Sequence, residues 1–291
     1  MKLHGQITRQ SCALLLLLTL ASIETPAAEK QTVFEPVHWA YSSFFGTGWY
    51  NVDDARSVFV LRVPIRQTLR TSSITETGER EPGIELMYPL TLGMHQIEDL
   101  GGIIKNDNFA TVSFTPGVEL EIPINQHWYI RTSAHAGWGT DLKSDESAWI
   151  YYAGIKSRYV FPAKKYQWSL LNSLFYAGYS PDGGRSDHLA VAQLGVELLQ
   201  PLSKMAIHGE PVDLHWSMMY SFLGNEIHFN LPDGSFDPIG DQIEIGLQMS
   251  LRNRPFKVWF LEVQRLGLGY QFSPDGELTA ITFSMSSWFT N

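Results

Sequence analysis

The sequence predicts an all-β fold, a transmembrane antiparallel up-and-down β-barrel of about twelve strands. Segments of strand length in which apolar and polar residues alternate recur along most of the chain. Aromatic residues stand at the ends of several of these segments, as at the two interfaces of a membrane. The connections between them alternate between short and long, which is typical of outer-membrane barrels.

The first 28 residues have the layout of a secretory signal peptide. A basic start with Lys2 and Arg9 precedes a short apolar run at residues 13–21, and small residues follow at 25–28. The apolar run is too short to cross a bilayer as a helix. We therefore expect a signal peptide at 1–28, a short periplasmic leader at 29–36 and a single outer-membrane barrel at 37–291.

Composition and charge limit the classes of protein. The chain has 291 residues, of which 44% are hydrophobic and 18% charged, and its net charge is -9. Disordered chains are less hydrophobic and more charged, and nucleic-acid binding usually requires a basic surface. The only cysteine, Cys12, lies in the predicted signal peptide, so the exported chain would be held by its hydrogen-bonded architecture instead of disulfides.

The alternating segments give the strands in order. The first, residues 37–50, is rich in aromatic residues but is interrupted by Gly46 and Gly48. Alternation is clearest at 109–122, where Val112, Phe114 and Val118 oppose polar neighbours. The expected strands are residues 37–50, 56–69, 84–92, 109–122, 128–138, 147–161, 168–179, 189–199, 212–223 and 243–251, then two runs flanking the turn at 273–276, the second ending in Trp288 and Phe289.

Loop lengths indicate which end of the barrel faces the periplasm. Short connections are expected at 123–127, 162–166 and 252–256, and long ones at 93–108, 139–147, 180–188 and 224–241. Short turns lie on the periplasmic side and long loops outside. Neighbouring strands of the barrel run in opposite directions, and the last strand is expected to end in the periplasm. Counting back from it, the strand at 56–69 runs toward the periplasm, so another strand must precede it, and residues 37–50 are the candidate. The connection at 70–82 is long for a periplasmic turn, so a ten-stranded barrel is the alternative.

A soluble β-sandwich also alternates apolar and polar residues. Its strands average about 5 to 6 residues, whereas the runs here are mostly ten to fourteen residues long. That length suits a tilted membrane strand. The soluble periplasmic β-protein is therefore the less favoured reading.

With the apolar stripe toward lipid, charged residues of the strands point into the lumen. Six carry each sign, and a balanced lining argues against strong ion selectivity. We expect an ion-paired interior with a structural role, or a narrow pore. The residues assigned to the lumen are Arg62, Arg66, Glu85, Glu119, Glu121, Arg131, Lys156, Arg158, Glu197, Asp213, Glu244 and Arg252.

Two pairs of residues could support nucleophilic hydrolysis, which needs a base within hydrogen-bond reach of a hydroxyl. Ser133 lies near His135 on one strand, and Asp213 lies near His215 on another. Residues two apart in a strand have Cα atoms about 6 to 7 Å apart, and no third member is identifiable. We therefore assign no catalytic residue and expect no enzyme, with a barrel-embedded hydrolase acting on lipid A or peptides as the alternative.

Two acidic loops could in principle hold calcium or magnesium that bridges lipopolysaccharide phosphates. Neither matches the calcium-loop pattern with its fixed glycine and terminal Glu. We assign no metal and no cofactor. The carboxylates concerned are Asp141, Asp145 and Glu146 in one loop and Glu226, Asp233, Asp237 and Asp241 in the other.

The end of the chain carries a family resemblance. From Arg265 the sequence reads R-L-G-L-G-Y-Q-F, followed by a tight turn and an alternating run ending at Phe289. This pattern resembles the C-terminal strands of Gram-negative outer-membrane barrels, in particular the solitary autotransporter-like β-barrel family. The resemblance implies the fold of a translocator-type barrel without a passenger and a location in the outer membrane. We expect a monomer surrounded by outer-membrane lipid and lipopolysaccharide, with no nucleic-acid partner. The resemblance also implies recognition of the last strand by the barrel-assembly machinery, and it transfers no catalytic residues.

Overall fold

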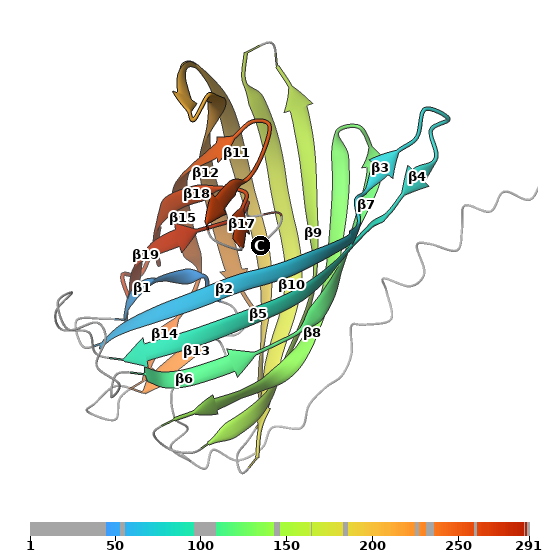
Figure 1. Cartoon of the computed structure of the whole chain (residues 1–291). Helices are drawn as coiled ribbons and strands as arrows, with labels where there is room; N and C mark the ends of the chain where they lie inside the picture. Colours follow the sequence, from blue (N-terminus) through green and yellow to red (C-terminus); the bar gives the residue numbers. More distant parts are fainter. Residues whose placement is uncertain are drawn as a thin grey trace, which may run out of the picture. The chain divides into compact units, whose positions relative to one another are not determined.

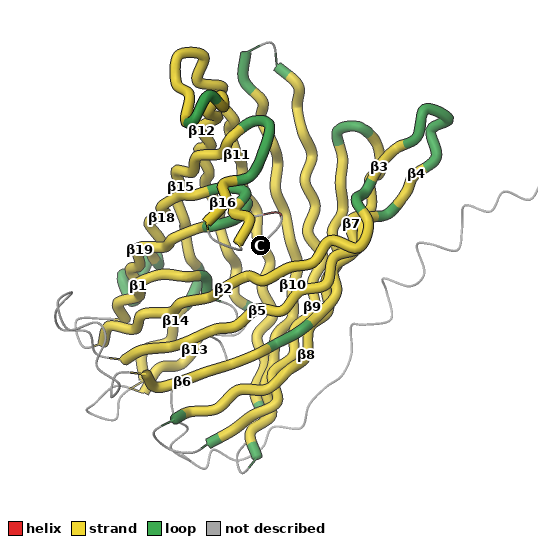
Figure 2. Tube along the Cα trace, in the orientation of Figure 1, coloured by secondary structure: helices red, strands yellow, loops and turns green. Residues whose placement is uncertain are grey.

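The computed structural model describes residues 45–52, 56–95, 109–142, 146–163, 165–182, 186–224, 227–230, 236–258, 261–287 and 289. Thirteen of the described strands form one antiparallel sheet that closes on itself (Figures 1 and 2), and the other six pair as three two-stranded sheets. The predicted signal peptide and leader lie outside the described residues. Within those residues, no helix has the length and apolar character needed to cross a bilayer.

The closed sheet is a twelve-stranded barrel, as the sequence predicts. Each strand pairs with its neighbour in the chain, and β2 pairs with β5 across a small hairpin. The barrel strands are β1 (Thr47–Val52), β2 (Arg56–Arg70), β5 (Gly83–His95), β6 (Phe109–Phe114), β7 (Gly117–Asn125), β8 (Trp128–Asp141), β9 (Ser147–Pro162), β10 (Gln167–Pro181), β11 (Asp187–Ile207), β12 (Glu210–Leu223), β15 (Gln242–Leu251), β18 (Leu266–Phe272) and β19 (Leu278–Ser284).

β6 and β7 are two halves of one strand position. Both pair with β5 on one side and β8 on the other. Thr115 and Pro116 separate them, but the backbone pairing continues because Thr115 donates to Pro89 and Ala136 donates to Pro116. The predicted strand at 109–122 is therefore one strand of the barrel that is interrupted at Thr115 and Pro116. Proline has no N–H to donate, which accounts for an interruption at this point.

The barrel closes between its first and last strands. β1 pairs with β19 from Thr47 opposite Phe283 to Val52 opposite Leu278. The prediction of a first strand before residue 56 is thus confirmed, but its bounds differ: β1 is Thr47–Val52, Phe45 and Gly46 precede it, and residues 37–44 lie outside the described residues. Gly48 permits this closure because a Cβ there would lie 2.8 Å from the carbonyl oxygen of Ile281.

Three two-stranded hairpins lie in the described connections between barrel strands. They are β3 (Ser73–Ile74) with β4 (Arg80–Glu81), β13 (Ile227–Asn230) with β14 (Phe236–Ile239), and β16 (Phe256–Val258) with β17 (Leu261–Val263). The first accounts for the long connection at 70–82, which folds back on itself around Gly78 (φ 83°). The last shows that the predicted short connection at 252–256 is wrong, because residues 252–265 join β15 to β18.

The distribution of polarity is the reverse of that in a water-soluble protein. Large apolar side chains are exposed on the outer wall, including Trp149, Leu174 and Leu268. Charged side chains such as Glu119 and Arg131 are buried. Because a strand alternates its side chains between two faces, one sequence pattern produces both the apolar exterior and the polar interior.

The interior changes character along the barrel axis. Near the end where Val52 and Leu278 pair, an apolar cluster includes Tyr50, Ile150 and Leu189. Ile239 of β14 is fully buried in the same cluster, so the connection between β12 and β15 contributes to the filling. The opposite half is dominated by buried ionic groups.

The chain end departs from the sequence prediction. β19 stops at Ser284 instead of continuing to Phe289, and Ser286, Ser287 and Phe289 are buried. The ring of Phe289 lies against the guanidinium of Arg131, which provides it with an interior partner. The run predicted to end in Trp288 and Phe289 therefore pairs with β1 only up to Phe283.

Candidate functional site

The first interior site is centred on Arg131 of β8. Its Nη1 lies 2.9 Å from Glu119 Oε2 and 3.1 Å from Glu85 Oε2, and its Nη2 lies 2.6 Å from Glu121 Oε2. Arg66 adds a second cation, with Nη1 3.8 Å from the same Glu85 oxygen. We call Arg66, Glu85, Glu119, Glu121 and Arg131 the Arg131 cluster.

Strand register explains why these groups meet. Glu85 and Glu119 stand directly opposite each other on β5 and β7, a like-charge pairing that is unfavourable by itself. Arg131 lies on β8, the other neighbour of β7, where it pairs with Glu121. Its guanidinium donates to Glu85 and to Glu119 and so bridges these two carboxylates. A guanidinium presents five donors in a planar fork, so one arginine can satisfy several carboxylates.

The chain end contacts this cluster. The Phe289 ring centroid lies 5.4 Å from Arg131 Cζ, within the range of a cation–π interaction. The phenyl side chain is 4% exposed. The tail after β19 is therefore an internal element near the end of the barrel where β8 begins.

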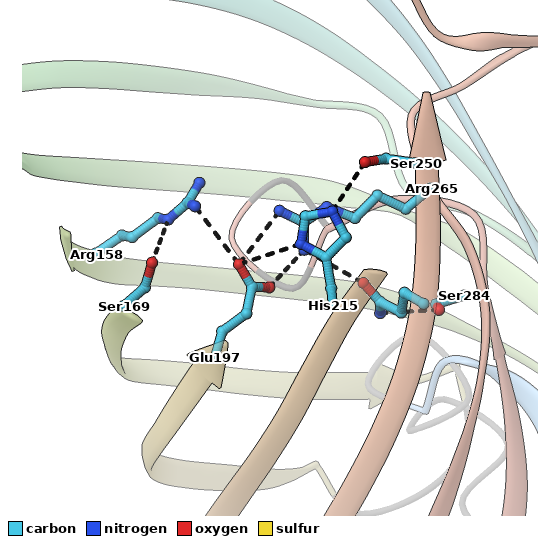
Figure 3. A network of polar contacts seen from close by, with 8 residues as sticks. Arg158, Ser169, Glu197, His215, Ser250, Arg265 and Ser284 are labelled. Carbon is cyan, nitrogen blue, oxygen red and sulfur yellow. Dashed lines mark hydrogen bonds and ion pairs between the residues drawn. The ribbon is translucent and has the colours of Figure 1, made fainter. Parts of the chain in front are cut away.

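The second interior site is centred on Glu197 of β11 (Figure 3). Arg265, just before β18, donates to both carboxylate oxygens, with Nη2 3.3 Å from Oε1. Arg158 Nη2 lies 3.5 Å from Oε1, and Arg158 Nε donates to Ser169 Oγ at 3.3 Å. His215 Nδ1 lies 3.7 Å from Glu197 Oε1.

His215 also contacts a hydroxyl on the next strand. Its Nε2 lies 2.8 Å from Ser250 Oγ, and the imidazole is almost fully buried. Gln248 completes the arrangement by accepting from Arg265 at 3.3 Å and donating to Ser284 Oγ at 2.9 Å. We call Glu197, His215 and Ser250 the Glu197 triad.

The other residues assigned to the lumen lie apart from these two sites. Arg252 Nη2 lies 2.6 Å from Asp213 Oδ1, beyond the end of β15, and the Arg252 side chain is 44% exposed. The hydrogen bond to Asp213 raises the pKa of Arg252 above its usual value. Arg62 donates to the Tyr152 hydroxyl at 3.0 Å, and Glu244 accepts from Thr282 Oγ1 at 2.8 Å.

A small cavity lies between the apolar cluster and the ionic half. Its volume is about 180 Å³, and its lining combines charged and aromatic side chains. The charged ones are Arg62, Glu119, Lys156 and Glu244, and the aromatic ones include Phe45, Tyr50, Tyr152 and Phe175. Space of this size suits several water molecules or one small ligand.

The two residue pairs considered for hydrolysis are not brought together as pairs. His135 stacks on Tyr152 at 4.0 Å, and its Nδ1 lies 3.2 Å from the Thr115 carbonyl oxygen. His215 contacts Glu197 and Ser250 instead of Asp213. Ser250 is on the inward face of the predicted strand 243–251, so alternation could have indicated it, whereas Arg265 lies just outside a strand.

The two acidic loops contain the carboxylates that were considered as possible ligands of calcium or magnesium. Asp241 accepts from the Tyr220 hydroxyl at 2.8 Å and from the Leu223 amide at 3.1 Å, so it anchors its loop to β12. Among the residues that the structure describes, no group of three or more His, Cys, Asp and Glu side chains could hold a metal ion. Glu226, Asp233 and Asp145 lie outside the described residues.

Comparisons with known proteins identify the fold. No protein-family model matches the sequence, and a search of curated proteins found no match. Among solved structures, the chain is similar to the β domain of the Bordetella autotransporter BrkA, with a TM-score of 0.51 at 11% sequence identity. The match covers 81% of this chain and 92% of the BrkA domain. The chain therefore has the fold of an outer-membrane barrel of the autotransporter β-domain type.

Proposed function

We propose that the chain is an integral outer-membrane β-barrel, of the translocator type but without a passenger, that has a structural role or acts as a narrow, normally closed pore. In this proposal it reaches the outer membrane of a Gram-negative bacterium after export by the predicted signal peptide. It inserts with the barrel-assembly machinery, and lipid and lipopolysaccharide surround it.

The observation that carries the proposal is the continuous apolar outer wall. Leu174, Trp149, Leu268 and Ile281 on β10, β9, β18 and β19 are each more than half exposed. Soluble monomers rarely expose contiguous apolar patches larger than a few hundred Å². A surface of this composition all around a closed sheet suits a hydrocarbon environment.

The interior supports a closed state. The apolar cluster fills one half, while the Arg131 cluster, Phe289 and the Glu197 triad occupy the other. The cavity between them is about 180 Å³. Any conduction would require the chain end or the interior side chains to move.

Fractionation and gel migration test the membrane assignment. A folded barrel should remain with the outer-membrane fraction and should migrate differently on gels before and after boiling. Release of the protein by a wash buffer without detergent would contradict the proposal. Conductance of the purified protein in planar bilayers then separates the two roles, since a structural barrel gives no channels and a narrow pore gives rare, small ones.

A further inference from the structure

The Glu197 triad has the geometry of a nucleophile, a base and an orienting carboxylate. Ser250 Oγ lies 2.8 Å from His215 Nε2, and the opposite ring nitrogen, Nδ1, lies 3.7 Å from Glu197 Oε1. The three residues come from the adjacent strands β15, β12 and β11. Such triads are recognised by geometry and roles, not by sequence order.

We infer that Ser250, His215 and Glu197 form a nucleophilic site that hydrolyses short-chain carboxylic esters. This inference goes beyond the proposed membrane role. It also departs from the sequence-based expectation of no enzyme, because Ser250 and Glu197 are far apart in the sequence and only the barrel brings them to one imidazole.

The carboxylate determines the tautomer of His215. Nδ1 is buried and makes no hydrogen bond, and Glu197 Oε1 lies 3.7 Å from it. A lone pair on Nδ1 would face the negative carboxylate, so the proton is favoured on Nδ1. Nε2 is then the acceptor for the Ser250 hydroxyl, as a general base requires.

The contact between His215 Nδ1 and Glu197 is longer than a hydrogen bond. His135 has a similar contact, with its buried Nε2 3.9 Å from Glu119 Oε1, so this gap does not by itself mark a catalytic base. What distinguishes His215 is the Ser250 hydroxyl, 2.8 Å from its other ring nitrogen. Catalytic hydrogen bonds are often long in the free enzyme and shorten when substrate binds.

Two arginines fix Glu197 and bring positive charge to the site. Arg265 donates to both Glu197 oxygens, and Arg158 contacts Oε1. Arg265 also lies close to Ser250 along the sheet, because Met249 pairs with Leu266, the residue that follows Arg265. Positive charge here favours the oxyanion that develops on an attacked carbonyl.

The chemistry is acyl transfer to serine followed by hydrolysis. Ser250 Oγ attacks the ester carbonyl carbon while its proton moves to His215 Nε2. The bond from the acyl carbon to the alkoxy oxygen then breaks, and His215 returns the proton to the leaving alcohol. Water, deprotonated by His215, hydrolyses the acyl-serine to release a carboxylic acid and regenerate Ser250. Glu197 acts through His215 and is a positioning residue.

The surroundings limit the size of the substrate. The Ser250 side chain is half-buried, inside a barrel whose described cavity is about 180 Å³. Ser284 lines that cavity and accepts from Gln248, which in turn accepts from Arg265. No residue of the triad lines this cavity, and Gln248 and Ser284 lie between the cavity and Arg265. Only a small ester with a short acyl group is therefore expected to reach Ser250.

The test uses the full chain, folded in detergent, with a fluorophosphonate probe and with p-nitrophenyl acetate. We expect covalent labelling at Ser250, identified by peptide mass, and ester hydrolysis that is lost in Ser250→Ala. His215→Gln should slow labelling by about 100-fold, since a general base contributes roughly 10²- to 10⁴-fold. Glu197→Gln should slow it by tenfold up to about 10⁴-fold, the loss caused when a triad carboxylate becomes an amide, and Glu197→Asp should restore part of the rate.

The control is Ser113 on β6, a buried serine that belongs neither to the triad and its arginines nor to the cavity lining. Ser113→Ala should therefore keep wild-type labelling. A serine esterase labelled in parallel shows that the probe is active. If the folded wild type is not labelled under the same conditions, the inference is overturned. Equal labelling of Ser250→Ala and the wild type would overturn it as well. Migration with and without boiling, measured on the same samples, reports the barrel separately.

Discussion

Phe289, close to the chain end, lies over the guanidinium of Arg131, with 5.4 Å between the ring centroid and Cζ. Arg131 is at the same time the cation that joins Glu85, Glu119 and Glu121. One arginine therefore links the wall of the barrel to its tail. If the barrel conducts, release of the tail from Arg131 would open it. Loss of Arg131 is expected to destabilise the interior because three carboxylates share this cation.

Replacing Phe289 tests the tail as a gate. Phe289→Ala removes a cation–π contact worth about 1 to 2 kcal/mol at a desolvated position, which corresponds to roughly a 5- to 30-fold change in an equilibrium. We expect a comparable increase in the open fraction in planar-bilayer recordings. Phe283→Ala is the matched control, because Phe283 on β19 is 44% exposed on the outer wall. Equal currents from the two variants would exclude the tail as the barrier.

Removing the cation of the Arg131 cluster should destabilise the barrel. Arg131→Met leaves three carboxylates close together without their main partner, and breaking a buried ion pair costs about 3 to 5 kcal/mol. Urea unfolding in detergent micelles, followed by tryptophan fluorescence, measures the loss. Arg80→Met on the exposed hairpin β3–β4 is the control and should change stability by less than about 0.5 kcal/mol. Similar losses in both variants would contradict the role assigned to Arg131.

The sequence predicts the wall of the barrel better than its interior. Alternation has a period of two residues, so it predicts both the strands and the outward face of Leu174 or Trp149 without knowledge of the partners. The parity of the connections also predicts a first strand around Gly46 and Gly48; the structure has this strand, with Gly48 in β1 and Gly46 just before it. Loop length alone does not show that residues 70–82 fold into β3–β4, because that depends on local pairing around Gly78.

Contacts across the lumen are not encoded in any local pattern. Arg265 and Glu197 are 68 residues apart, and Arg265 lies between β17 and β18, outside any strand, where alternation does not apply. The tail is a second example: Phe289 continues the aromatic pattern of β19, yet an interior cation gives it a different position. Charge balance in the sequence predicts that interior groups can pair, but it does not predict which ones do.

A charge on the outer wall tests the membrane environment. Leu174 lies midway along β10 and is 61% exposed. Leu174→Arg should destabilise the folded barrel by about 2 to 4 kcal/mol in lipid, as for arginine at the midplane of other barrels. Glu79→Arg, on the exposed turn between β3 and β4, should have little effect. Folding yields in lipid vesicles measure both variants, and a fully tolerated Leu174→Arg would contradict a lipid-facing wall.

A methyl group at Gly137 tests the close approach at the break between β6 and β7. A Cβ there would lie 2.0 Å from the carbonyl oxygen of Phe114 and 2.6 Å from the Cα of Thr115, both of them backbone atoms. Gly137→Ala should therefore cost about 1 to 3 kcal/mol, since the backbone must shift to accommodate it. Gly46→Ala is the control, because its nearest atom would be 3.9 Å away. An unchanged unfolding midpoint for Gly137→Ala would show that β6 and β7 approach β8 less closely.

The orientation of the barrel can be measured with single cysteines. Pro274, in the turn between β18 and β19, and Glu76, in the turn between β3 and β4, are exposed at opposite ends of the barrel. The chain's only cysteine is Cys12, in the predicted signal peptide, so an added cysteine would be the single thiol of the exported protein. In intact cells a membrane-impermeant maleimide should label Pro274→Cys, whereas Glu76→Cys should react only after the outer membrane is permeabilised. The reverse pattern would invert the assignment of short turns to the periplasm, and labelling of both variants in intact cells would contradict a barrel sealed in the outer membrane.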